Sequence, residues 1–498
     1  MKFRFFHTNP RISRLLICVS AVLFLSTPRE RSGQDGANSP RLSVVKITVL
    51  RRVYGPRLPY LIEPKLETIQ GAGLVIRNKY IVTDGELTRD AANISISFAE
   101  EKKSWTARVA FQGFDSGLSL LRVNEESFYS LAKPLEEFQN ELPRLGENLS
   151  ILGFDRNGSL AHGNFSVSLI KRTYLHDSDA DRRRLIFPQE GSRLPGYKFQ
   201  GAPVLRGGKL VGVYRPAKTP YLVHVSALNH FLEDIKDNRY DGFPHPGFFY
   251  SPLIHPVHRR AAGLSEDDSN GVLIRRFSYF SPGWRILEPD DALLSLNGHV
   301  VNSRGNMNVD GRVMELSEYI ASRGPEALSA EVRRSKNTVQ LTLRPAPSSS
   351  YSWRRRRSNE KRPYFISAGI VFQELDYELF HDGGLNGDPL IRYRYLYYYE
   401  DRLNEQSDRD IILTSRLPDP ANDAVRPFLN GVVEFINGRR VRNLRDFAKE
   451  WNSSQGRYIA LQFMNRALPL LIPREKIKQT DKRIREKYDI RARSNVEQ

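Results

Sequence analysis

The sequence predicts a mainly β protein to which the second half adds two related α+β modules. Short apolar strands with turn signals between them follow one another over residues 42–227. Regular short strands without intervening helices are typical of an all-β sandwich or barrel. Further along, the pairs Asn297-Gly298 and Asn437-Gly438 lie in two similar segments, and a basic stretch separates them. A β half followed by two copies of one module is therefore expected.

Length and charge limit the class of protein. The chain has 498 residues, enough for roughly three domains. Its 40% hydrophobic content suits a globular protein better than a disordered one. Lys and Arg outnumber Asp and Glu by 75 to 57, which gives a net charge of +18. Such a surface favours anionic partners such as lipid headgroups, acidic glycans or nucleic acid, although an ordinary solvated basic surface is the preferred interpretation.

The N-terminus resembles a secretory signal. Four basic residues precede an apolar run at 15–26, and the run is too short for a comfortable membrane span. An N-terminal anchor that stays uncleaved is the alternative. The only cysteine, Cys18, lies inside this run, so cleavage would leave no thiol. Residues 1–41 are expected to be a signal or anchor followed by a flexible, breaker-rich leader.

The β half is expected over residues 42–239. Its clearest strand is NISISF, residues 93–98, which alternates strictly as a half-buried strand should. Other apolar runs begin at Val109, Leu118, Leu149 and Phe165. One helix closes this half, with Ser226 as its predicted N-cap. Its apolar face has helical spacing and consists of Leu228, Phe231, Leu232 and Ile235.

The two modules are expected at residues 240–346 and 363–498, with a basic linker at 347–362. Each Asn-Gly pair stands between apolar residues, which is a strong hairpin signal. A helical stretch and then a pair of strands follow each hairpin. The linker begins at Pro347 and contains several serines and four consecutive arginines, a composition typical of a solvated connection.

The order and spacing of these segments resemble the Deg/HtrA family, in which a trypsin-like double β-barrel is followed by two PDZ domains. GAGLVIRNKYIVTDGELT resembles the first hairpin and the loop with the catalytic base. FDSGLSLLRV resembles the strand with the catalytic aspartate, and FQGAPVLRGGKLVGV the nucleophile loop. YDGFPHPGFFY resembles the start of the first PDZ domain. YFISAGIVFQEL through EFINGRRVRNL resembles the second PDZ domain of the plant-type Deg branch.

The resemblance also shows which catalytic positions are altered. The family pattern T-N-x-H corresponds to Thr-Asp-Gly-Glu here, so Glu86 stands at the base position. Gly117 stands at the aspartate position and Gln200 at the serine position. Lys198 replaces the glycine that helps to shape the oxyanion hole.

Each replacement removes one part of the mechanism. A carboxylate is a weaker general base than imidazole, glycine cannot orient a base, and the nitrogen lone pair of a glutamine amide is delocalised. The sequence therefore predicts a pseudoprotease. The alternative is an active serine endopeptidase with an unorthodox site, for which Ser192, His162 and His176 are candidates, although no spacing connects them.

The predicted binding site lies in the first PDZ-like module. PDZ domains add an extended chain end as a strand and hold its carboxylate with backbone amides. PGFFY stands where the family has this loop, so Gly247, Phe248 and Phe249 are the predicted peptide-binding residues. The alternative is a buried strand beside a closed groove. The resemblance implies peptides or unfolded protein C-termini as partners, and homo-oligomers such as trimers. It also implies an exported protein in the periplasm or cell envelope. An anionic envelope surface is a further candidate partner there.

No cofactor or metal is expected. EDDSNG, residues 266–271, begins like a calcium loop, but its twelfth position is Phe277 rather than glutamate. His255 and His258 have no further ligands nearby in the sequence. The run RYRYLYYY, residues 392–399, alternates basic and aromatic residues as nucleic-acid binders do. In an exported chain, packing is the preferred interpretation, which argues against nucleic acid as a partner.

Overall fold

The structure is a computed structural model of the chain. It describes residues 42–496, with gaps at 62–63, 100, 156, 175–181, 189–198, 246, 278–280, 325, 348–361 and 399–400. The predicted signal, Lys198, Ser192 and His176 lie outside the described residues. Among the helices that the structure describes, none has the length and apolar character needed to cross a membrane.

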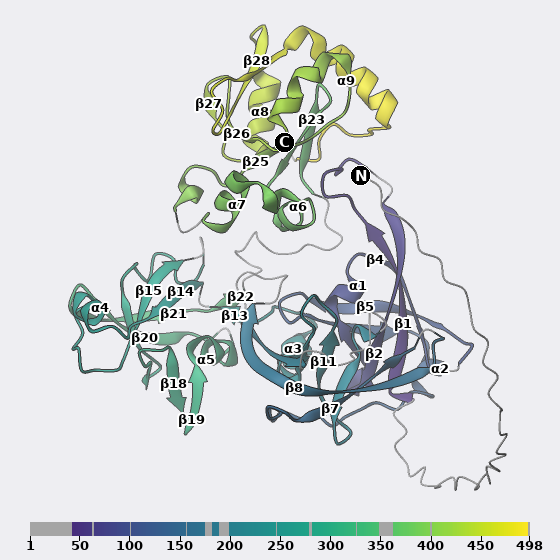
Figure 1. Cartoon of the computed structure of the whole chain (residues 1–498), viewed down its shortest axis with the longest axis vertical. Helices are drawn as coiled ribbons and strands as arrows, with labels where there is room; N and C mark the ends of the chain where they lie inside the picture. The colour runs from purple at the N-terminus through teal and green to yellow at the C-terminus, as the bar shows by residue number, and fades with distance from the viewer. Residues whose placement is uncertain are drawn as a thin grey trace, which may run out of the picture. The chain divides into compact units, whose positions relative to one another are not determined.

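Two closed six-stranded barrels form the β half, as the fold class predicts (Figure 1). The strand order of the first barrel is β1-β2-β3-β6-β5-β4. Its strands are β1 (Val44–Val53), β2 (Lys65–Ile76), β3 (Tyr80–Asp84), β4 (Ala91–Ser97), β5 (Trp105–Gly113) and β6 (Leu118–Val123), with the short helices η2 (Arg77–Lys79), α1 (Gly85–Thr88) and α2 (Glu126–Tyr129). NISISF falls on β4, where Ile94 and Ile96 are buried.

The second barrel has the strand order β10-β11-β12-β9-β8-β7. Its strands are β7 (Asn148–Phe154), β8 (Leu160–Tyr174), β9 (Arg182–Pro188), β10 (Pro203–Arg206), β11 (Lys209–Arg215) and β12 (Tyr221–His224). The closing helix α3 (Val225–Asp234) continues into η4 (Ile235–Asp237). The predicted N-cap was wrong: His224 caps α3, because its ring nitrogen accepts the Ser226 N–H at 3.3 Å.

The first α+β module is built on a sheet with the order β14-β15-β16-β20-β21. Its strands are β13 (Pro244–His245), β14 (Phe248–Pro252), β15 (Val272–Phe277), β16 (Ala292–Leu296), β17 (His299–Val300), β18 (Asn306–Val309), β19 (Arg312–Glu315), β20 (Leu328–Arg334), β21 (Asn337–Leu343) and β22 (Ala346–Pro347). Its helices are α4 (Pro256–Ala261) and α5 (Leu316–Ser322).

The second module has the sheet order β23-β24-β25-β26-β28-β29. Its strands are β23 (Tyr364–Ser367), β24 (Ile370–Glu374), β25 (Ile411–Arg416), β26 (Val432–Ile436), β27 (Arg439–Arg440), β28 (Tyr458–Phe463) and β29 (Leu470–Pro473). Its helices are α6 (Tyr377–His381), η6 (Leu385–Gly387), α7 (Pro389–Leu396), η7 (Leu403–Glu405), η8 (Pro420–Phe428), α8 (Leu444–Ser453) and α9 (Arg474–Tyr488).

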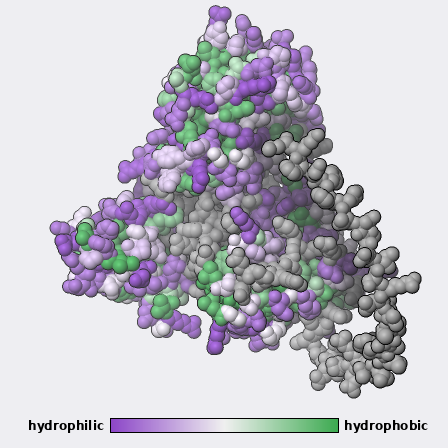
Figure 2. Space-filling view, viewed as in Figure 1, coloured by the Kyte–Doolittle hydropathy of each residue, from purple (hydrophilic) through white to green (hydrophobic). Residues whose placement is uncertain are grey.

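The basic and aromatic run of the second module falls largely on α7. Arg394 and Tyr395 are buried there, and the Arg394 guanidinium contacts Asp410 with two hydrogen bonds of 2.7 Å. These two residues of the run therefore serve packing, while Tyr393 and Tyr397 remain exposed at the surface of the helix. In the view of Figure 2 the described surface is mostly hydrophilic, with small hydrophobic areas between.

The internal repeat is visible in the backbone of both Asn-Gly turns. Asn297 and Asn437 have φ values of 48° and 49°, and the glycine after each has φ of 79°. Positive φ at both positions is the type I′ hairpin geometry that Asn-Gly favours. The Asn297 side-chain oxygen accepts the Ser329 N–H at 2.8 Å, and that of Asn437 accepts the Ala460 N–H at 2.9 Å. Each turn is thus tied to the strand that follows the helix of its own module.

Candidate functional site

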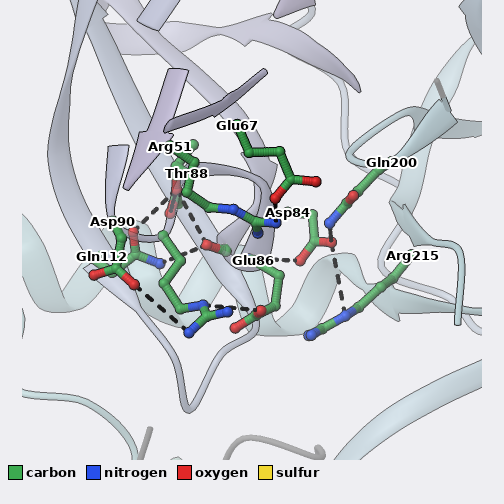
Figure 3. Close-up of polar contacts among 12 residues, drawn as sticks. Arg51, Glu67, Asp84, Glu86, Thr88, Asp90, Gln112, Gln200 and Arg215 are labelled. Atoms are coloured by element: carbon green, nitrogen blue, oxygen red, sulfur yellow. Dashed lines mark hydrogen bonds and ion pairs between the residues drawn. The ribbon is translucent and has the colours of Figure 1, made fainter. Parts of the chain in front are cut away.

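Asp84 lies at the centre of the predicted site. It ends β3 and caps the short helix α1, where its Oδ1 accepts the Glu86 N–H at 3.1 Å. Its other oxygen, Oδ2, accepts the Gln200 side-chain amide at 2.7 Å and lies 3.8 Å from the Arg215 guanidinium (Figure 3). Asp84 is only 2% exposed, so these neighbours replace the water that a carboxylate normally requires.

Glu86, at the predicted base position, forms an ion pair with Arg89. Its Oε2 lies 3.2 Å from the Arg89 Nε, and the two side chains are only 13% and 17% exposed. Arg89 also lies 3.7 Å from the Asp90 carboxylate. The carboxylate at the predicted base position is therefore engaged by a guanidinium group.

Gly117, at the aspartate position, lies beside the start of α1. Its carbonyl accepts the Gly85 N–H at 3.0 Å, and its φ is 71°. Glycine adopts this left-handed conformation without steric cost. The aspartate position therefore supplies a backbone carbonyl to α1 and has no side chain with which to orient a base.

The nucleophile loop packs tightly against the first barrel. The Gln200 carbonyl accepts the Ala72 N–H at 2.8 Å. Gly201 has φ of 79°, and a Cβ there would lie 2.0 Å from the Thr83 hydroxyl. Its N–H donates to the Tyr214 carbonyl at 2.9 Å. Burial raises the pKa of Tyr214 to about 12, so this phenol stays neutral.

Asp115 does not replace the missing aspartate, although it lies two residues before Gly117. Its carboxylate accepts the Tyr240 hydroxyl at 2.5 Å and the Phe243 N–H at 2.8 Å. These contacts direct it to the segment that follows the second barrel. Its role in the described structure is to hold this segment.

The structure brings the three predicted positions close to Asp84. Gln200 and Glu86 donate to its carboxylate, and Gly117 contacts α1, the helix that Asp84 caps. Sequence reasoning missed Asp84 and Arg215 as members of the site. The sequence did contain a signal for Asp84, because aspartate directly before Gly85-Glu86 is a favoured helix N-cap. Arg215 gave no signal, because only the tertiary structure brings it to this carboxylate.

The predicted peptide-binding loop begins with a constrained glycine. Gly247 has φ of 72°, and a Cβ there would lie 2.0 Å from the Ser281 Cβ. The Ser281 hydroxyl donates to the Gly247 carbonyl at 2.9 Å, and the Gly247 N–H donates to the His245 Nδ1 at 2.9 Å. This amide therefore has a side-chain acceptor at the place where the resemblance puts a peptide carboxylate.

The two phenylalanines after Gly247 have different environments. Phe248 is 3% exposed and belongs to the core of the first module. Phe249 is half-buried, and the Arg276 guanidinium lies 4.4 Å from the centre of its ring. Of the two phenylalanines, only Phe249 has side-chain surface with which to contact a ligand. Phe248 is part of the core.

β14 and β24 are equivalent strands of the two modules. Each follows a glycine with φ of 72°, Gly247 and Gly369. Each pairs with the next strand in antiparallel register, and the register shifts at the same point, between Phe249 and Tyr250 in β14 and between Val371 and Phe372 in β24. The two modules therefore share one topology at this edge.

The outer edge of β24 is filled by the chain itself. β23 pairs with it in antiparallel fashion, with Phe365 opposite Phe372. The Phe365 ring also packs against Phe447 and Trp451 of α8, at centroid distances of 5.7 and 5.6 Å. β14 is instead the last strand of its sheet in the described residues, with no strand at its outer edge.

Comparison with known proteins identifies a PDZ domain in the last part of the chain. A family profile described as PDZ domain matches residues 354–495. Protease Do-like 2, chloroplastic, from Arabidopsis thaliana is 24% identical over 424 residues, which cover 81% of this chain and 67% of that protein. Putative protease Do-like 13 from the same plant is 23% identical over 397 residues, which cover 77% of this chain and 78% of that protein.

Among solved structures, the HtrA-type protease AlgW with tripeptide aligns over 61% of this chain and 94% of that one, with 14% identity and a TM-score of 0.48. The double barrel, the matched PDZ domain and the Do-like relatives agree with the resemblance found in the sequence. These findings support the Deg/HtrA family that the sequence resembles.

Proposed function

We propose that this chain is a Deg/HtrA-type pseudoprotease that captures peptides or unfolded chain ends through its first PDZ-like module. The contrast between the two equivalent strands carries the proposal: β24 already has a strand at its outer edge, whereas β14 has none in the described part of the chain. Addition of a ligand strand to a free sheet edge is how PDZ domains bind.

The second module supplies a template for this binding. β23 runs antiparallel to β24, and its Phe365 contacts α8. By the repeat, a ligand strand beside β14 would present one side chain to α5 and place its end near Gly247. A free carboxylate there would compete with His245 for the Gly247 N–H, and a charged acceptor makes the stronger hydrogen bond.

Peptide binding by the full chain tests this part of the proposal. Fluorescence anisotropy is measured with a labelled peptide that ends in phenylalanine, either as the free acid or as the C-terminal amide. We expect saturable binding of the free acid and about tenfold weaker binding of the amide, since the amide lacks the charge. Equal affinities, or no binding by a folded chain, would show that the β14 edge is not the binding site.

The lack of peptidase activity is the other part of the proposal. Gln200 offers no activated oxygen, and Arg89 engages Glu86. We expect no cleavage of casein and no labelling by a fluorophosphonate probe. Gln200→Ser alone should also be inactive, because Gly117 leaves the serine without an oriented base. Turnover that Ser192→Ala abolishes would favour the active-endopeptidase alternative.

Export is part of the same proposal and rests on residues 1–41 alone. A reporter enzyme that is active only outside the cytoplasm, fused after residue 41, should give signal. Retention in the cytoplasm would remove the argument for a periplasmic or envelope location.

Homo-oligomers, such as the trimers that the family resemblance implies, are tested by light scattering of the full chain.

A further inference from the structure

A groove of about 630 Å³ opens on the second module, along one face of α9. The end of α8 contributes Trp451 and Asn452 to its lining, and β28 contributes Ile459. Trp451 and Ile459 are 4% and 1% exposed, so they form an apolar floor that is itself part of the core. The volume is within the usual range of small-molecule sites, roughly 300–1,000 Å³.

The wall of the groove that α9 forms is strongly basic. Arg474, Lys478, Lys482 and Arg485 all line it. Their spacing of four, four and three residues places them on one face of the helix. Arg493 lines the groove as a fifth cation. The carboxylates in the lining are Asp481 and Glu486, so five positive and two negative groups give a net charge of +3.

Asp481 offsets only part of this positive charge. Its Oδ2 lies 3.9 Å from the Arg493 guanidinium, and its carboxylate also contacts the module behind the groove. Its Oδ1 accepts the Ala368 N–H at 2.5 Å, and its Oδ2 accepts the Ser367 hydroxyl at 3.2 Å. Burial raises the pKa of Asp481 above the ordinary aspartate value. The acid therefore holds the turn between β23 and β24 and leaves the groove with an excess of positive charge.

Lys478 and Lys482 are the two cations free to meet a ligand. Within the described part of the chain neither ammonium group has a hydrogen bond or ion pair. The three arginines are held by protein acceptors: Arg474 by the Gln455 carbonyl at 2.9 Å, Arg485 by the Arg491 carbonyl at 3.4 Å, and Arg493 by the Asn452 side chain. The groove thus combines fixed guanidinium groups with two mobile ammonium groups about one helical turn apart, roughly 6 Å.

We propose that this groove binds a compact oligophosphate anion, with successive phosphate groups on Lys478 and Lys482 and the arginines at its two ends. Phosphate groups match this site because each one accepts several hydrogen bonds and arginine can contact it with two parallel donors. The inference concerns the second module and does not depend on the loss of peptidase activity or on peptide binding at β14.

Isothermal titration of the full chain with tripolyphosphate tests the proposal. We expect saturable binding with one site per chain. The double variant Lys478→Ala/Lys482→Ala should weaken it by about tenfold or more, because both unpaired cations are lost. Inorganic phosphate and sulfate, which carry one anionic group each, should bind more weakly than tripolyphosphate. Both lysines are exposed, so the variant should keep the circular dichroism spectrum of the wild type.

A second double variant separates the groove from the net charge of the chain. Lys476 and Lys487 lie on the same helix but do not line the groove. Lys476→Ala/Lys487→Ala removes the same charge and should change the dissociation constant by no more than about twofold. Equal weakening by both double variants, or no saturable binding by the wild type, would overturn the proposal.

Discussion

The Gln200 side-chain amide donates a hydrogen bond to the Asp84 carboxylate at 2.7 Å. Asp84 ends β3 of the first barrel, and Gln200 lies in the loop before β10 of the second. The residue that the sequence resemblance assigns to the nucleophile position therefore donates to a buried carboxylate at the junction of the barrels. This contact gives Gln200 a structural role between the two barrels.

Gln200→Ala should destabilise the barrels by about 1–3 kcal/mol, because a nearly buried carboxylate loses a hydrogen-bond donor. Urea unfolding followed by circular dichroism measures the difference. Gln340→Ala is the matched control, since the Gln340 amide contacts the Glu331 carboxylate at 2.9 Å on an exposed surface. Equal losses for the two variants would show that the Asp84 contact carries no special stability.

Gly247→Ala should destabilise the first module and reduce peptide binding. Alanine pays roughly 1–2 kcal/mol for the left-handed backbone, and its Cβ would also lie 2.0 Å from the Ser281 Cβ. Gly298→Ala tests the backbone cost alone, because Gly298 has φ of 79° and nothing within 4 Å of its Cβ position. Thermal unfolding of both variants should show the larger loss for Gly247→Ala. The reverse order would contradict the close packing of Ser281.

Arg394→Ala should cost about 3–5 kcal/mol, because it leaves the Asp410 carboxylate buried without its guanidinium partner. Both side chains of this pair are under 5% exposed. Arg442→Ala removes a pair of the same 2.7 Å length, with Asp408, whose side chains are 45% and 50% exposed. That variant should lose at most about 1 kcal/mol. Urea unfolding of the two variants compares a buried ion pair with an exposed one.

Asp419→Asn should destabilise the second module at neutral pH and have less effect in acid. The hydrogen bonds from Arg483, at 2.8 and 2.9 Å, lower the pKa of Asp419. A lowered folded-state pKa gives stability that is present above the unfolded value, near 3.9, and lost as the pH falls through the folded value. Melting temperatures of wild type and variant should therefore converge as the pH falls below the lowered pKa of Asp419.

Arg483→Gln is the matched variant, because it removes the other partner of the same contact. It should show the same convergence in acid. A difference between wild type and Asp419→Asn that stays constant from neutral to acid pH would mean that the carboxylate charge does not contribute. The Asp419 bond to the Ala421 N–H would then account for the whole effect.

The sequence by itself determined the features that depend on local chemistry. Alternating apolar residues gave the strands of the barrels, since one face of each strand must be buried. The Asn-Gly pairs specified both hairpins, because only such residues accept positive φ at both turn positions. The order of motifs gave the resemblance to the Deg/HtrA family, which the comparisons support. The residue types at Glu86, Gly117 and Gln200 predicted an altered site.

Only the tertiary structure decided which groups meet across long distances in the chain. Asp84 and Arg215 join the site because two barrels pack together, and no local pattern encodes that contact. The difference between β14 and β24 also appears only in the sheets. β23 pairs with the outer edge of β24, whereas among the described residues no strand pairs with the equivalent edge of β14. The N-cap of α3 was misplaced for the same kind of reason. A serine is the commoner cap, but the folded backbone brings the His224 ring to the free N–H.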